Sequence, residues 1–205
     1  MFGNDPVSTA EALEILRLLG APPRLMRHGE LVSQVAAQIS EAFSRLRMDH
    51  NAILVATGAA LHDAGKIVHP NELEASGSNH EAAGEQLLLS RGLSAKLARI
   101  CRTHGQWEGA DVTFEERFVA LADHVWKGTR NESLEKLIMQ DAGHRLGLEP
   151  WEVFMEIDSQ LEKIAAGASA RLASARTAGN SNNVDQSSMP STIPMIRRTN
   201  CGCTG

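Results

Sequence analysis

The chain has 205 residues, of which 42% are hydrophobic and 22% are charged, the balance of an ordinary globular domain. Its formal net charge of -5 argues against the basic surface that binds a nucleic acid polymer or an anionic membrane. Three cysteines do not make a disulfide framework, no apolar run is long enough to span a bilayer, and the N-terminus has no signal-peptide pattern. We therefore expect a cytoplasmic protein.

Helical periodicity dominates the sequence, and no stretch alternates in the manner of a half-buried strand. The segment AILVATGAALHD, which Asn51 precedes as a cap, is apolar nearly all round, so we expect this helix at the centre of the fold. Caps and periodicity predict helices at about 8–20, 22–47, 51–63, from 79 onward, and at 94–105, 113–127, 132–146 and 150–166.

Residues 1–168 are thus predicted to form one all-α domain. From about Gly167 the composition changes to Ala, Ser, Asn, Gly and Pro with almost no periodicity. Such a segment buries little apolar area, so residues 169–205 are predicted to be a disordered tail. Cys201 and Cys203 near its end lack the partner pair that a structural zinc site needs.

Six histidine and aspartate residues lie on the apolar faces or at the ends of the predicted helices. An unpaired polar group is costly in such a place, and these two residue types hold Zn, Mn or Fe in hydrolytic and oxidative sites. A single histidine on an apolar stripe is more often a hydrogen-bonded core residue, and an aspartate is explained equally well by a neighbouring Arg or Lys. Taken together, the six predict a metal site: His28, His62, Asp63, His80, His104 and Asp123.

The adjacent pair His62 and Asp63 would point about 100° apart on a helix, so both reach one cluster only from a groove beside it. In that groove Asp63, with two oxygens, is expected to bridge two ions. The first ion would then be held by His28, His62, Asp63 and Asp123, which leaves Asp63, His80 and His104 for the second.

Five segments, RHGELVSQVA, LHDAGK, NHEAAGEQLL, RTHG and ALADHVWKG, carry these residues between about His28 and Gly128. In order and type they resemble the motifs of the HD superfamily of metal-dependent phosphohydrolases. The resemblance implies a single helical bundle with metal ligands at the six positions. His80 and His104 are similar to the two-metal branch, which includes bacterial diadenosine tetraphosphate hydrolases. Two divalent ions (Mn, Fe, Zn, Co or Ni) are therefore expected as cofactors.

The function that follows is hydrolysis of a nucleotide or another small phosphate ester by a metal-activated hydroxide. Asp63 and Lys66 are the catalytic candidates, and Lys66, Arg102 and Arg130 are candidates for binding substrate phosphate, although a solvated surface position explains each cation as well. Glu72 and Glu74 are candidates for a general acid. The same ligands also suit a di-iron oxygenase acting on a small organic substrate, which iron content and oxygen dependence would reveal. A non-catalytic HD signalling module is the third interpretation.

Overall fold

The computed structural model describes residues 2–180, with side chains through Thr177. Every regular element in this range is helical, which confirms the predicted all-α fold. The elements, in chain order, are α1 (Thr9–Leu18), α2 (Pro23–Arg45), α3 (Ala52–Leu61), the 3-10 helices η1 (Ala64–Ile67) and η2 (Pro70–Leu73), α4 (Asn79–Ser90), α5 (Ala95–Ala98), α6 (Ile100–Thr103), α7 (Phe114–Val125), α8 (Glu132–Leu146), α9 (Pro150–Ala166) and α10 (Ala168–Asn180).

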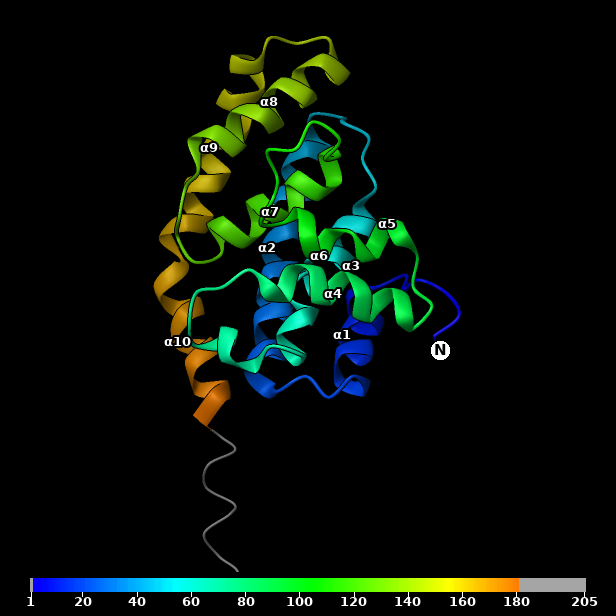
Figure 1. The fold of residues 1–205 in the computed structure, drawn as a ribbon. Helices are drawn as coiled ribbons and strands as arrows, with labels where there is room; N and C mark the ends of the chain where they lie inside the picture. The colour runs from blue at the N-terminus through cyan, green and yellow to red at the C-terminus, as the bar shows by residue number, and fades with distance from the viewer. Residues whose placement is uncertain (1, 181–205) are drawn as a thin grey trace, which may run out of the picture.

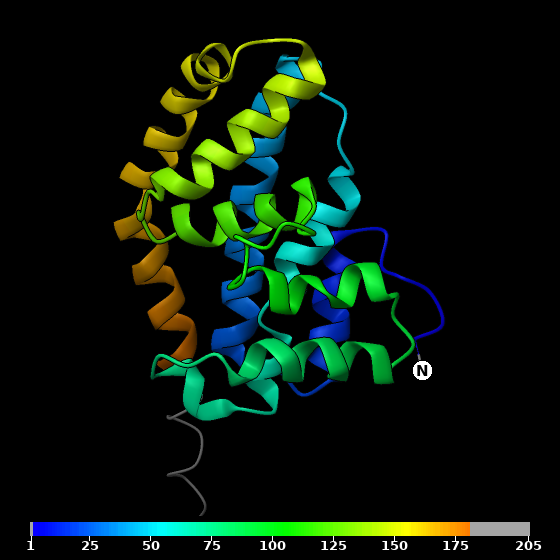
Figure 2. The same ribbon diagram turned by 45° about the horizontal axis from the view of Figure 1, so that its top comes forward.

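The helices α2 and α3 form the centre of the bundle, as the apolar character of α3 predicts. The 23-residue helix α2 packs against α1, α3, α7, α9 and α10, and it runs through the middle of the molecule in Figure 1. The short helices α4 and α6 pack together beside η1. The pair α8 and α9 closes the opposite end of the bundle, as Figure 2 shows.

An aromatic cluster anchors the end of α2 that lies away from its N-terminus. Phe43 on α2 packs against Phe114 and Phe118 on α7, with ring centroids 5.6–5.7 Å apart. The His50 ring stacks on Phe118 at 5.6 Å, so this histidine is a packing residue. All three phenylalanines are buried, and each contributes on the order of 2–3 kcal/mol by leaving water.

Close contact between α2 and α3 depends on a glycine. A Cβ atom placed on Gly29 would lie 2.5 Å from the carbonyl oxygen of Ala60, far inside van der Waals contact. Because the opposing atom belongs to the backbone, α2 and α3 approach this closely only if position 29 has no side chain. The contact sets His28 directly beside the C-terminal end of α3.

The structure corrects two boundaries. The helix predicted for 94–105 is divided at Arg99, whose carbonyl accepts hydrogen bonds from both Arg102 N and Thr103 N. The disordered tail predicted from residue 169 is wrong for its first part, because α10 extends to Asn180 and packs on α2. The sequence of α10 has little helical periodicity, so this helix was not predicted. Contacts with the rest of the bundle hold it in place. The remainder of that prediction, residues 181–205, lies outside the described residues.

Within residues 2–180, every helix is too short or too polar to cross a lipid bilayer.

We expect Gly29→Ala to lower the free energy of unfolding by about 1–3 kcal/mol, because the new methyl group forces α2 and α3 apart. Chemical denaturation measures the change. Gln38→Ala, on the exposed face of the same helix, is the matched control and should change stability by less than about 0.5 kcal/mol. If the two variants were equally stable, the close contact at Gly29 would not limit how closely α2 and α3 approach.

Candidate metal centre

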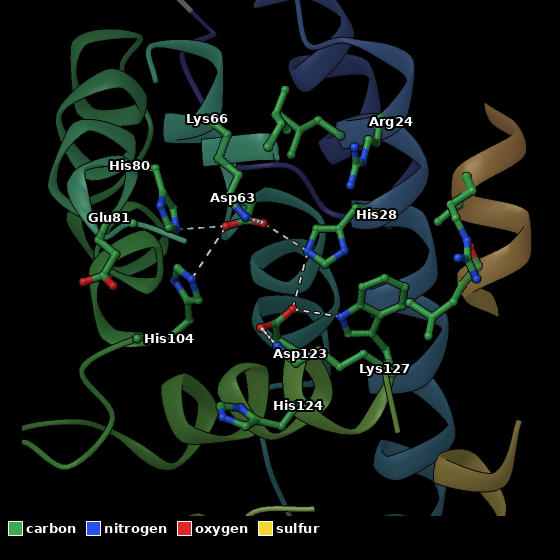
Figure 3. A pocket seen from close by; sticks show the side chains of 18 residues that line it. Arg24, His28, Asp63, Lys66, His80, Glu81, His104, Asp123, His124 and Lys127 are labelled. Carbon is green, nitrogen blue, oxygen red and sulfur yellow. Dashed lines mark hydrogen bonds and ion pairs between the residues drawn. The ribbon is translucent and has the colours of Figure 1, made fainter. Parts of the chain in front are cut away.

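The six histidine and aspartate residues come from six helical elements or their ends and converge on one place. His28 lies on α2, His62 ends α3, and Asp63 follows at the start of η1. The other three lie in the first turn of α4, at the end of α6 and on α7: His80, His104 and Asp123. Figure 3 shows the side chains of five of them turned toward one another, with Asp63 in the middle: His28, Asp63, His80, His104 and Asp123.

One oxygen of Asp63 faces the first group of candidate ligands. Its Oδ2 atom lies 3.0 Å from His28 Nε2 and 3.6 Å from His62 Nε2. The two imidazole nitrogens are 3.1 Å apart, and Asp123 Oδ1 lies 3.4 Å from each. The donor atoms of His28, His62 and Asp123 all lie within 4.8 Å of one another, close enough to share one ion.

The other oxygen of Asp63 faces the second group. Its Oδ1 atom lies 3.1 Å from His80 Nε2 and 3.7 Å from His104 Nε2. His62, Asp63 and His104 form the second set with donor atoms mutually within 4.8 Å, so His62 stands between the two groups. His80 approaches Asp63 but does not belong to either compact set.

The end of helix α3 explains how Asp63 reaches both groups. The helix ends at His62, and Asp63 has φ -98° and ψ 13°, outside regular helical geometry. Behind it, a Cβ on Gly65 would lie 1.8 Å from the carbonyl oxygen of His80 and 2.6 Å from the backbone nitrogen of Gly84. The missing side chain lets η1 press against the first turn of α4, which brings Asp63 and His80 together.

Three of the histidines are held so that Nε2 faces the cluster. His62 Nδ1 lies 2.8 Å from Ala59 O, and His104 Nδ1 lies 2.8 Å from Cys101 O. His80 Nδ1 lies 2.6 Å from the carboxylate of Glu72. Because each Nδ1 faces a hydrogen-bond acceptor, Nδ1 carries the proton and the lone pair lies on Nε2. This is the usual arrangement of a metal-binding histidine.

Glu72 does more than hold the His80 ring. Its carboxylate also accepts the backbone N–H groups of Asn79 and His80, so it caps α4 from the preceding element η2. The hydrogen bonds from His80 and Asn79 lower the pKa of Glu72 to about 2. Asn79 is the first residue of this helix, where the sequence predicts it to begin.

The carboxylates and the imidazoles of the cluster shift one another's pKa values. Burial raises the pKa of Asp63 and Asp123, but the nearby histidines outweigh it and hold both well below their usual range. Burial lowers the pKa of His62 and His80, but the carboxylates outweigh it and raise both above 6.5. His104, buried and close to His62, has a pKa lowered to about 4. The two carboxylates thus require positive charge, which a bound cation supplies.

His80 Nε2 offers a direct test of whether a metal fits. It is the buried side-chain polar atom within the described residues that lacks a hydrogen bond, since Asp63 Oδ1 at 3.1 Å is not aligned with it. Leaving a buried polar atom unsatisfied costs about 1–3 kcal/mol. A divalent ion between His80 and Asp63 satisfies it, so both the donor set and this atom fit a metal.

Trp126 supports the first group from behind. Its indole Nε1 donates to Asp123 Oδ1 at 3.1 Å, and its ring packs edge-on against His28 with centroids 4.8 Å apart. These two contacts fix the orientation of residues that the sequence predicts to share an ion. The hydrogen bond from Trp126 to Asp123 is not predictable from the sequence pattern.

A cavity of about 540 Å³ opens over the cluster. Lys66, the lysine considered for phosphate binding, lines it with Nζ 2.7 Å from Asp63 Oδ2. The sequence missed several polar lining residues, although two of them adjoin predicted ligands in the chain: Arg24, Glu81, His124, Lys127 and Arg176.

The structure places the two predicted substrate-binding arginines elsewhere. Arg102 pairs with Glu85 and lies outside the cavity, although it is two residues from His104. Arg130 donates to the carboxylates of Glu135 and Asp158 on α8 and α9. Both guanidinium groups are committed to neighbouring acids, so neither enters the site proposed below.

The family model for the HD domain matches residues 25–142, a range that contains all six converging residues. No solved structure matches the chain. HD domains bind divalent metals and are generally hydrolases. Since the match covers more than half of its 205 residues, the chain belongs to the HD domain family.

Proposed function

We propose that this protein is a divalent-metal-dependent phosphohydrolase that acts on a nucleotide or another small phosphate ester. The observation that carries the proposal is the position of Asp63, whose two carboxylate oxygens face two separate groups of imidazole nitrogens. A carboxylate between two histidine groups is the arrangement expected where two ions share a bridging ligand.

The residues would be divided between the ions as the sequence predicts. His28, His62, Asp63 and Asp123 would hold the first ion, and Asp63 with His80 and His104 would hold the second. When bound, such ions supply Lewis-acid activation of water and of the phosphoryl oxygens. His62 lies close to both groups, since it belongs to both compact sets of donor atoms.

Lys66 has the clearest role among the remaining residues. Its ammonium group lies beside Asp63 at the floor of the cavity, held by one hydrogen bond to Oδ2. Once cations satisfy Asp63, this ammonium is available for a phosphoryl oxygen of the substrate. It would stabilise the negative charge that develops there during hydrolysis.

Protonation of the leaving group is assigned by elimination within the cavity. Glu72 is committed to His80, and Glu74 is paired with Arg24, so neither loop glutamate is placed to serve. His124 lines the cavity with its Nδ1 bound to Ala120 O, which leaves the other ring nitrogen for a proton transfer. Glu81 lines the cavity too, with one carboxylate oxygen bonded to Gln106. One of these two groups would protonate the leaving oxygen.

Metal stoichiometry tests the site. After dialysis against Mn²⁺, the wild-type protein should hold two equivalents, and His80→Ala or His104→Ala should hold one and lose most hydrolysis of p-nitrophenyl phosphate. Asp63→Ala should lose both ions, because it contributes to each set. His144→Ala, on the exposed part of α8, is the control and should match wild type. A wild type that binds no metal contradicts the proposal, and activity that requires iron and O2 favours the oxygenase.

The role of Glu72 gives a second prediction. Glu72→Gln removes the charged acceptor of His80 Nδ1, so the second ion should bind about 10–100-fold more weakly while the first is retained. Metal titration followed by calorimetry measures both affinities. Glu74→Gln is the matched control, because Glu74 lies two residues away in the chain and its side chain is exposed. Equal affinities in the two variants would contradict an orienting role for Glu72.

Acidification should release the metal. In the metal-free protein the pKa values of His62 and His80 lie above 6.5, so as pH falls through that range both gain protons that compete with the ion. His104, with a pKa of about 4, stays neutral there. Affinity should therefore be highest above pH 7.5 or so and fall steadily toward about pH 6. Titrations in two buffers of different ionisation enthalpy should show proton release on binding, and a pH-independent affinity would contradict this linkage.

A further inference from the structure

The match to the HD domain ends at residue 142, but residues beyond this point also line the cavity. Leu172, Ala175 and Arg176 of α10 line the same cavity as Asp63 and Lys66. Figures 1 and 2 show α10 lying along the N-terminal half of α2, next to the 3-10 helices that follow α3. A segment outside the family domain therefore completes the pocket of its metal centre.

Directed contacts hold α10 in this position. Arg171 donates to the carbonyl oxygens of Trp126 at 2.8 Å and Val125 at 3.3 Å, at the C-terminal end of α7. From the other side, Arg27 of α2 donates two hydrogen bonds to Ser174 Oγ, at 2.6 and 3.1 Å. These contacts tie α10 to α2 and α7, which carry His28 and Asp123 of the first group.

The cations that line the cavity differ in what they bind. Arg24 pairs with Glu74, Lys66 with Asp63, and Lys127 lies 3.5 Å from Asp123. The Arg176 guanidinium donates from Nε to the Leu172 carbonyl of its own helix at 3.3 Å, and within residues 2–177 it pairs with no carboxylate. Its two terminal amino groups are thus left to bind an anion in the forked geometry that suits a phosphate.

We propose that α10 selects the substrate, and that Arg176 binds a second anionic group carried at the end opposite the phosphoryl group that reacts. Leu172 and Ala175 would contact the organic part between the two charged ends. The proposal rests on the phosphohydrolase function above and specifies its substrate class as a phosphate ester with two separated anionic groups. The cavity of about 540 Å³ is within the range of pockets that enclose a whole small molecule.

A matched pair of stable ligands separates this role from general phosphate binding. Butylphosphonate carries one anionic group, and butane-1,4-diphosphonate carries a second one at the far end of the same chain. In calorimetric titrations of the Mn²⁺-loaded protein, Arg176→Gln should weaken the diphosphonate roughly tenfold, the low end for a hydrogen bond to a charged group. Its affinity for butylphosphonate should remain within about twofold of wild type. Arg91→Gln, on the exposed end of α4, is the control and should bind both ligands as wild type does.

The outcomes distinguish this inference from the function on which it rests. If Arg176→Gln weakens both ligands equally, or neither, Arg176 does not read a second anionic group and the inference is overturned while the metal centre stands. If the metal-loaded wild type binds neither phosphonate, the phosphohydrolase proposal fails and the inference fails with it. Unchanged thermal unfolding of Arg176→Gln confirms that a loss of binding is local.

Discussion

A buried carboxylate must meet positive charge or donors on both of its oxygens, and in this protein that requirement is concentrated at Asp63. Its side chain is 5% exposed, and His28, His80, His104 and Lys66 all approach it. An unpaired charge at this depth would cost several kcal/mol. The surrounding helices therefore place imidazoles and an ammonium group on every side of it, and the rest of the site follows from that placement.

Two positions without side chains make the placement possible. Gly29 lets α2 approach α3, which brings His28 to one oxygen of Asp63, and Gly65 lets η1 approach α4, which brings His80 to the other. Both glycines serve close packing against a backbone atom, and neither has a positive φ. The second explains in steric terms why a glycine follows the His-Asp pair by two residues.

The sequence predicts best what depends on residue type and periodicity. The bounds of α8 and α9 agree with the predicted 132–146 and 150–166, because both helices have clear caps. The converging residues were recognisable because histidine and aspartate are unusual on apolar stripes. The direction in which a side chain points was harder to predict. Arg102 and His104 are two positions apart on a helix, which is about 200° around its axis, so Arg102 turns toward Glu85 instead of the cavity. The sequence names Glu72 only as a candidate general acid, and it does not predict α10. The observed role of Glu72 and the position of α10 both depend on contacts through space, with α4 and with the end of α7.

The proposed ligand positions run from residue 28 to residue 123 and lie on six separate elements or their ends, so an unfolded chain cannot present them together. Ions held there would consequently bind the native state and not the denatured one. Each tenfold rise in free metal above the dissociation constant then adds about 1.4 kcal/mol to the stability of the fold. With metal bound at the proposed site, the melting temperature would become a readout of the metal supply in the surroundings, and a chelator would act as a denaturant.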